Sequence, residues 1–261
     1  MPSSHEAVPD VLKAAFRRAW MPVLSLFLLL ALWQITAWLA HSPLLPSPLS
    51  VFEVLIREIR SGVLPRHLGV TLGRLAISFA IAMVLGVVLG VWLGRHPQWD
   101  RLFDPWLTTL LNIPALVTII LCYVWFGLVE PAAIAAVVIN KLPNVAVTLR
   151  EGTRVLDRDL LEMAQCYRFG RWKTLRHVVW PQLAPFALAA ARTGLALIWK
   201  IILVVELLGR SDGMGFQLQL FFQMFDVAGI LAYTVAFIAV IQSIEALLLQ
   251  PLERHARRWR R

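Results

Sequence analysis

Six runs of mostly apolar residues, each about twenty residues long, dominate this chain of 261 residues. They lie near residues 20–40, 70–94, 107–127, 131–149, 183–208 and 228–250. A helix of about 20 apolar residues crosses the hydrocarbon core of a bilayer, which is about 30 Å thick. Charged residues make up only 16% of the chain, against about 25% in a typical soluble domain. We therefore predict an all-α integral membrane protein with about six transmembrane helices.

The basic residues are unevenly distributed among the segments that connect these runs. Lys and Arg gather in residues 1–19, 95–104, 150–182 and 251–261, whereas the other connections carry few of them. Cytoplasmic loops of membrane proteins carry the excess of Lys and Arg. We therefore predict a cytoplasmic N-terminus over 1–19, one transmembrane domain over 20–250 with a cytoplasmic loop at 150–182, and a basic cytoplasmic tail over 251–261. The net charge of +9 then reflects topology and contact with membrane lipid, and we expect no nucleic-acid partner.

The first apolar run follows basic residues, as the core of a signal peptide does. It is longer than the usual core of roughly 7–15 residues, and no clear cleavage site of small residues follows it. We therefore expect this run to be retained as a membrane anchor.

The longest polar segment, residues 150–182, separates the fourth and fifth apolar runs. Connections between helices of a bundle are normally about 2–8 residues long, so a segment of this length indicates a separate task. Either Asp157 or Asp159 favours the start of the second part of a helix in this segment. Gly170 marks a turn, and Pro181 leads into the next run. The pattern predicts a helix, a turn and a second helix that project into the cytoplasm and bind a partner.

The polar segment resembles the permease subunits of bacterial ABC importers that use a substrate-binding protein. The signature of that family reads EAA, three residues, G, nine residues, I, one residue and LP. Glu162 and Ala164 stand at the positions of the Glu and the second Ala. Val178 and Pro181 stand at those of the Ile and the Pro. The resemblance implies a type I ABC importer permease-like fold, with a cytoplasmic coupling helix that sits in a groove of the ATPase.

Two of the departures from this signature matter for the coupling helix. Met163 replaces the first Ala, and Arg168 stands where the family has glycine, with Gly170 two positions later. The geometry of the turn after the coupling helix therefore stays open. The resemblance implies that eight residues couple the chain to the ATPase: Glu162, Met163, Ala164, Arg168, Phe169, Gly170, Trp172 and Pro181.

Four further stretches resemble the nitrate, sulfonate and taurine group of these permeases. They are RLAISFAIAMVLGVVLGVWLG, PALVTIILCYVWFGL, KIILVVELLGRSDGMGF and PLERHARRW. The resemblance implies a multi-pass protein of the bacterial cytoplasmic (inner) membrane that works as a homodimer, with its pathway at the dimer interface. It also implies two ATPase subunits on the cytoplasmic side and a periplasmic or lipid-anchored substrate-binding protein on the other side.

The chain has no phosphate-binding loop of the form G-x-x-x-x-G-K-[ST]. We therefore expect ATP hydrolysis in the partner, and no cofactor in this chain, since ATP and Mg²⁺ belong to the ATPase. The histidines lack the spacing of metal ligands, and no nucleophile lies beside a base, so we expect neither a metal site nor an enzyme. A secondary transporter or channel without an ATPase is the alternative class, although the sequence shows no inverted repeat and no pair of intramembrane carboxylates.

Polar and charged residues inside the apolar runs mark a candidate translocation pathway. Charged residues are costly in hydrocarbon and normally face a cavity or a partner. Lys141 and Asn144 lie in the fourth run, and Lys200 and Glu206 lie in the fifth. Ammonium and amide groups offer weak contacts to an anion that passes through a pore. We therefore predict that these four residues line the pathway.

A purely structural role for the intramembrane charges stays open. Lys200 could neutralise Glu206, within one chain or from the second subunit, and Arg192 could pair with Glu245. The substrate class also stays open. Small organic or inorganic anions, such as nitrate, sulfonates or taurine, follow from the resemblance, whereas aromatic carboxylates or vitamin precursors would fit the same permease.

Overall fold

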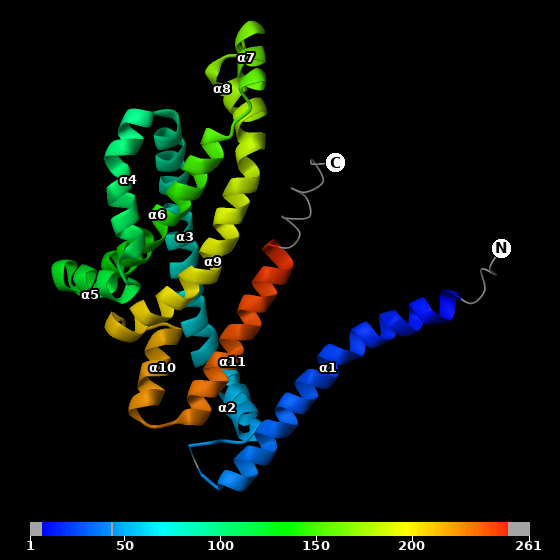
Figure 1. The fold of residues 1–261 in the computed structure, drawn as a ribbon. Helices are drawn as coiled ribbons and strands as arrows, with labels where there is room; N and C mark the ends of the chain where they lie inside the picture. The colour runs from blue at the N-terminus through cyan, green and yellow to red at the C-terminus, as the bar shows by residue number, and fades with distance from the viewer. Residues whose placement is uncertain (1–6, 43, 250–261) are drawn as a thin grey trace.

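The computed structural model describes residues 7–42 and 44–249, which form helices joined by short connections (Figure 1). The first six helices are α1 (Ala7–Ala40), α2 (Pro48–Arg60), α3 (Val63–Arg95), α4 (Pro97–Asn112), α5 (Ala115–Phe126) and α6 (Glu130–Arg154). They are followed by α7 (Arg158–Cys166), α8 (Arg171–Thr174), the π-helical turn η1 (Leu175–Val179), α9 (Trp180–Gly209), α10 (Met214–Gln223), α11 (Val227–Ile244) and the π-helical turn η2 (Glu245–Leu249). No strand occurs in the two described ranges, and the predicted all-α class is confirmed. The predicted basic tail lies outside the described residues.

Four helical stretches are long and apolar enough to cross a membrane: Val63–Arg95, Glu130–Arg154, Arg171–Gly209 and Val227–Leu247. They match the second, fourth, fifth and sixth predicted runs. α4 and α5 together add a fifth candidate, but they are bent by 98° at their junction. The first predicted run is represented among the described residues by the shorter apolar stretch Leu24–Ala40. The described residues therefore hold four candidate spans, or five if the bent pair counts as one.

The predicted apolar run over residues 107–127 is not one straight helix, because the chain breaks between α4 and α5. A residue that precedes proline is pushed out of the helical region. Ile113, which precedes Pro114, is extended, with φ −70° and ψ 125°. Pro114 then begins the next helix, since its carbonyl accepts a hydrogen bond from the N–H of Val117 at 3.0 Å. α6, by contrast, continues through Pro143.

α6 lies at the centre of the bundle and contacts α3, α4, α5 and α9. Gly86 and Gly90 of α3 face it one turn apart. A Cβ atom on Gly86 would lie 2.6 Å from Cβ of Val145, and one on Gly90 would lie 2.4 Å from the carbonyl oxygen of Ala146. Small residues let membrane helices approach closely. The glycines of α3 therefore allow the close packing on which the bundle is built.

The bundle has two distinct ends (Figure 1). α7 and α8 project at one end, beyond α6 and α9, whereas α2 and α10 lie at the opposite end. α2 packs there on α11, where Val51 and Val54 contact Ala232. α1 extends away from the other helices and is joined to them near its last turns, where Nε1 of Trp33 donates to the carbonyl of Pro46 at 3.0 Å.

Candidate functional site

The polar segment, residues 150–182, contains α7, α8 and η1 and protrudes from the bundle (Figure 1). α7 begins at Asp157, whose carboxylate accepts hydrogen bonds from the N–H groups of Asp159 and Leu160 at 2.9 and 3.3 Å. Such a cap satisfies N–H groups that have no partner inside the helix. Of the two predicted alternatives for the helix start, Asp157 is the cap, and Asp159 lies in the first turn.

α7 ends in a left-handed turn that Arg168 occupies, with φ +51°. The N–H of Arg168 donates to the carbonyl of Gln165 at 2.9 Å, and the N–H of Phe169 donates to the carbonyl of Ala164 at 2.8 Å. These two bonds form a Schellman motif, in which the left-handed position is usually glycine. Arg168 therefore keeps the backbone turn that the glycine of the signature suits, whereas Gly170 has an ordinary φ of −64°. Left-handed backbone costs a residue other than glycine about 1–2 kcal/mol.

The outer surface of the polar segment combines apolar and charged side chains. Tyr167 and Trp172 are each 73% exposed, and Met163 is also exposed. Glu162 is exposed and pairs with no residue of the described ranges. Ala164 is buried, so it belongs to the inner face of α7. The structure thus brings the predicted coupling residues to one protruding element, with most of their side chains directed outward.

The polar segment is tied back to α9 by one glutamine. The N–H of Asp157 donates to the side-chain oxygen of Gln182 at 2.9 Å, and the side-chain nitrogen of Gln182 donates to the carbonyl of Val178 at 2.9 Å. Pro181 lies in the first turn of α9, directly after the π-helical turn η1. The start of α7 is therefore joined directly to the start of α9.

A second set of contacts joins the end of α6 to α4. Arg150 donates to Asp100 at 3.0 Å and to Asp104 at 2.5 Å. Arg154 also pairs with Asp100, and it pairs with Glu151 at 2.9 Å. Arg150 and Asp100 are both buried. The polar segment is therefore held at both of its ends, by α4 at one and by its contact with α9 at the other.

Lys141 and Asn144 lie about one turn apart on α6. Lys141 is 2% exposed, and its Nζ donates to Oδ1 of Asn144 at 3.2 Å. Gly194 of α9 provides the space, since a Cβ atom there would lie 2.7 Å from Cε of Lys141. The structure therefore brings these two pathway candidates together. No carboxylate in residues 7–42 and 44–249 pairs with this ammonium.

Lys200 and Glu206 lie on different faces of α9, because six residues at about 100° each place them about 120° apart. Lys200 is exposed and Glu206 is fully buried. The expectation that Lys200 neutralises Glu206 within one chain is wrong, because Glu206 pairs with Arg74 of α3 at 2.8 Å. The expected pairing of Arg192 with Glu245 is confirmed at 3.8 Å. The four pathway candidates therefore do not form one group in this chain.

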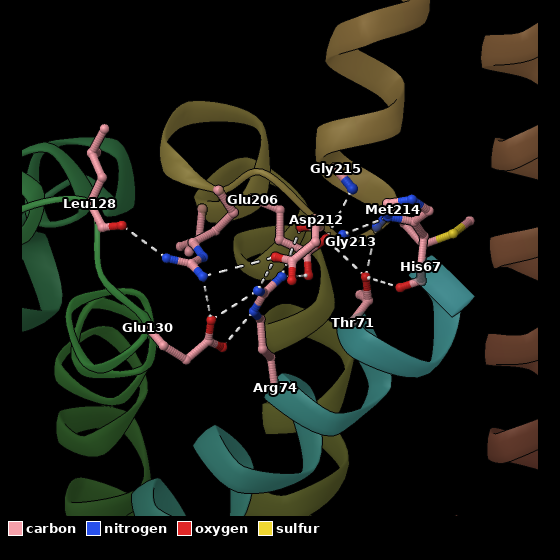
Figure 2. Close-up of polar contacts among 12 residues, drawn as sticks. His67, Thr71, Arg74, Leu128, Glu130, Glu206, Asp212, Gly213, Met214 and Gly215 are labelled. Carbon is pink, nitrogen blue, oxygen red and sulfur yellow. Dashed lines mark hydrogen bonds and ion pairs between the residues drawn. The ribbon is translucent and has the colours of Figure 1, made fainter. Parts of the chain in front are cut away.

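Five charged residues form an ion-pair cluster near the end that carries α2 and α10 (Figure 2): Arg74, Glu130, Glu206, Arg210 and Asp212. Arg74 is buried and uses all five of its N–H donors. Its Nε and Nη2 donate to the two oxygens of Glu130 at 2.6 and 2.9 Å. Its Nη1 donates to Glu206 at 2.8 Å and to the carbonyl of Asp212 at 2.9 Å, and Nη2 also donates to the Asp212 carboxylate. This guanidinium therefore fixes α3, α6 and α9 in one arrangement.

Glu206 is the most deeply buried carboxylate of the cluster (Figure 2). Besides Arg74, it accepts the hydroxyl of Thr71 and the N–H of Gly215, both at 2.9 Å. Gly213, with φ +103°, runs across this carboxylate, and a Cβ atom there would lie 2.3 Å from Cδ of Glu206. In the stretch ELLGRSDGMG, the backbone at Gly213 and Gly215 therefore lies directly against the side chain of Glu206.

Arg210 closes the cluster on the side of the connection between α5 and α6. It donates to the carbonyl of Leu128 at 2.9 Å and pairs with Glu130 at 2.8 Å. Burial raises the pKa of Asp212, but the hydrogen bond from Arg74 and the charges of Arg74 and Arg210 outweigh burial. They hold the pKa of Asp212 below its ordinary value of 3.8. Asp212 therefore stays ionised at neutral pH.

The sequence identifies Arg74 and Glu206 as intramembrane charges but does not show that they pair, and it misses the other two acids that bind Arg74. Glu130 and Asp212 lie at the ends of apolar runs, where a carboxylate looks like an ordinary surface residue. The available signal is the pair Gly213 and Gly215, since closely spaced glycines after a buried acid indicate a backbone that approaches it closely. Among the described residues, no three His, Cys, Asp or Glu side chains gather where they could hold a metal ion.

The long apolar helices and the protruding polar segment define a helical membrane protein with one polar projection. The family model described as "Binding-protein-dependent transport system inner membrane component" matches residues 82–258. The chain belongs to this family, whose members are permease subunits of ABC importers. It is therefore a multi-pass protein of the inner membrane.

Known proteins of this kind resemble the chain over most of its length. The permease SsuC of Escherichia coli (strain K12), named for the transport of aliphatic sulfonates, is 32% identical over 234 residues, which cover 88% of each chain. The riboflavin transport system permease protein RibX of Chloroflexus aurantiacus is 32% identical over 246 residues, which cover 92% of this chain and 89% of that one. The inward-facing structure of the MetNI methionine ABC transporter matches with a TM-score of 0.60 at 17% identity, over 75% of this chain and 98% of that chain. This last likeness shows the shared fold.

Proposed function

We propose that this permease subunit forms the substrate pathway as a homodimer, driven by two copies of a separate ATPase that binds the polar segment. In this proposal the polar segment and both chain termini lie in the cytoplasm, and a substrate-binding protein delivers the solute at the opposite face. ATP and Mg²⁺ belong to the ATPase, and this chain carries no cofactor of its own. One observation carries the proposal: the exposed surface of α7 and the turn after it.

That surface has the composition of a binding site for another protein. Tyr167, Trp172 and Met163 expose apolar side chains on an element that projects beyond the apolar spans. Aromatic residues, Met and Arg are enriched where proteins meet, and contiguous exposed apolar patches mark interaction sites. Glu162 and Arg168 add charges that pair with nothing in the described ranges. These features support α7 as the element that the ATPase engages.

The contacts at the base of the polar segment support its action as a lever. Gln182 links the start of α7 to α9, and Arg150 links the end of α6 to α4. A displacement of α7 would therefore move α6 and α9 together, as in other rigid-body transitions of packed helices. Gly194 of α9 lies against Lys141 of α6, so this movement would change the surroundings of that ammonium.

The exposed face of α9 supports the proposal that a second copy of the chain forms the other wall of the pathway. Lys200 lies nine residues before Gly209, or about 14 Å along the helix, and thus well inside the apolar span. A charged side chain at that depth faces a cavity or a partner and not lipid. Thr193 and Ala196, on the preceding turns of this face, are exposed as well. We assign this face to the aqueous pathway between two copies.

Small anions are the substrate class that these residues support best. Lys141, Lys200 and Asn144 provide two ammonium groups and an amide, and no carboxylate of the described ranges pairs with either ammonium. The relative SsuC is named for the transport of aliphatic sulfonates, which are anions. A vitamin such as riboflavin is the second candidate, because RibX is likewise 32% identical to this chain. We expect the binding protein to decide between them.

The assembly is tested by purifying the chain from its native membrane in mild detergent and identifying what accompanies it. The proposal predicts an ATPase with a phosphate-binding loop, at one copy per permease chain. If the chain came out alone and moved solute in liposomes without ATP, a secondary transporter or channel would replace the importer. Such a result would also remove the proposed role of α7.

The pathway assignment is tested by uptake of an aliphatic sulfonate into liposomes that hold the complex, with its binding protein supplied. Lys200→Met should lower the uptake rate while the ATPase still co-purifies, and Lys200→Arg, which keeps the charge, should retain most of the rate. Loss of folding in Lys200→Met would instead support a structural pairing of Lys200 with the second subunit.

A further inference from the structure

A groove of about 740 Å³ separates α3 from the start of α9, at the end of the bundle that carries α7 and α8. Its walls are mostly apolar, with Val87 and Val91 on α3 and Leu183 on α9. Trp92 and Trp180 flank it from the two helices and are both exposed. Tryptophan is enriched where a membrane meets water. The groove therefore lies at the boundary between the apolar spans and the polar segment.

The mouth of the groove is cationic. Arg95 is the last residue of α3, and Arg176 lies in η1 on the facing wall. Both are exposed, and neither pairs with a carboxylate in the part of the chain that the structure describes. From Val87 to Arg95, α3 rises by about 12 Å. The groove is thus apolar toward the middle of the bundle and positively charged at the end that carries α7 and α8.

This polarity selects among the molecules that could fill the groove. The basic tail, residues 251–261, would bring further arginines against Arg95 and Arg176. The same face of a second copy would oppose the same cations to each other. An anionic phospholipid has the complementary form, with an apolar chain and a phosphate at one end. Basic pockets between membrane helices on the cytoplasmic side suit such headgroups.

We infer that an anionic phospholipid docks in this groove, with an acyl chain between α3 and α9 and its phosphate between Arg95 and Arg176. The inference rests on the proposed orientation, since it places the groove in the cytoplasmic leaflet. Because Arg176 belongs to the polar segment and Arg95 to α3, the bound lipid links the two. Its headgroup charge therefore restrains the movement of the lever that the ATPase drives.

Native mass spectrometry of the purified complex, titrated with phosphatidylglycerol and with phosphatidylcholine, tests this site. We expect one tightly held phosphatidylglycerol per permease chain and weaker retention of phosphatidylcholine. The double variant Arg95→Gln/Arg176→Gln should lower the retention of phosphatidylglycerol about tenfold or more. Val91→Trp should lower it as well, because the indole fills the groove while both arginines remain. The matched control Arg101→Gln/Arg171→Gln removes two exposed arginines that do not line the groove and should bind as the unmodified chain does.

Two results would overturn the lipid site. One is equal retention of phosphatidylglycerol by the Arg95→Gln/Arg176→Gln variant and its control. The other is a disulfide between two chains that carry Val91→Cys, which would show that a second copy covers the groove. Labelling of the exposed thiol of Cys166 in sealed vesicles with an impermeant maleimide tests the orientation separately. A Cys166 thiol on the outer face would contradict the proposed function itself, whereas the expected orientation without selective lipid retention would contradict only the lipid site.

Discussion

The ion-pair cluster near α2 and α10 and the outer surface of α7, which lie toward opposite ends of the bundle, use charge in opposite ways. At the end near α2 and α10, Arg74 uses every donor it has, and the buried Glu206 accepts three hydrogen bonds from within the chain. On the polar segment, Glu162, Tyr167 and Trp172 are exposed, and the carboxylate of Glu162 has no partner among the described residues. Groups that are bonded inside the chain hold its helices together. Groups that are left open are available to another protein.

Because of this difference, substitutions in the two regions should affect different properties, namely the stability of the chain and its coupling to the ATPase. Removing one member of a buried ion pair leaves an uncompensated charge and is strongly destabilising. Changing an exposed side chain away from such features normally alters stability by less than about 0.5 kcal/mol. Substitutions in the ion-pair cluster should therefore unfold the chain more easily, and substitutions on α7 should leave it folded but poorly coupled.

The largest effect is expected from Arg74→Leu, which leaves Glu206 buried without its cation. We expect a loss of about 3–5 kcal/mol. For a chain of this size that corresponds to a melting temperature lower by roughly 6–20 °C in detergent. Arg57→Leu is the control, since Arg57 is 68% exposed and lies 4.0 Å from Glu58. Equal melting temperatures of the two variants would contradict a structural role for the cluster.

Gly213→Ala should have the next largest effect. Its Cβ atom would lie 2.3 Å from Cδ of Glu206, and φ at this position is +103°. We expect destabilisation by about 1–3 kcal/mol, measured as a lower melting temperature. Gly170→Ala is the matched control at the opposite end, because no atom lies within 4 Å of its added Cβ. A larger loss in Gly170→Ala than in Gly213→Ala would reverse the comparison between the two ends.

Arg168→Gly should stabilise the chain slightly. Glycine removes the strain of a left-handed arginine at φ +51°, although it also makes the unfolded chain more flexible. The expected gain is about 0.5–1 kcal/mol, seen as a small rise in melting temperature. Arg168→Val should lower it, because a β-branched residue tolerates this conformation poorly. A rise for Val, or a fall for Gly, would show that the turn is not held as the structure has it.

The smallest expected effect is the loss of the stabilising contribution of Asp212 at acidic pH. The pKa of Asp212 is lower in the folded chain than its ordinary value of 3.8, so its ionised form stabilises the fold above that pH. This contribution is lost as the pH falls from about 4 through the folded pKa. Asp212 is 42% exposed, which keeps the effect small. The difference in melting temperature between the natural chain and Asp212→Asn should therefore shrink as the pH falls below about 4, and a constant difference would rule out this linkage.

The helices that cross the membrane are readable from the sequence because length and apolarity alone define them. The start of α7 is readable too, because Asp157 carries its own local capping signal. The break at Pro114 cannot be predicted from the sequence, because a proline in an apolar run does not always end a helix. Pro143 also lies in such a run, and α6 continues through it. Packing around each proline decides between these outcomes. The contact of Arg74 with Glu206 joins residues 132 positions apart, and no local pattern encodes such a distance.

The most direct test of the division between the two ends is the number of solute molecules taken up per ATP hydrolysed. It should be measured in liposomes that hold the complete complex, for Glu162→Lys and for Glu53→Lys, an equivalent change on exposed α2. We predict that Glu162→Lys keeps its melting temperature but loses coupled uptake by about tenfold, while Glu53→Lys transports normally. Normal uptake per ATP in Glu162→Lys would contradict the role of α7 as the lever between the ATPase and the membrane.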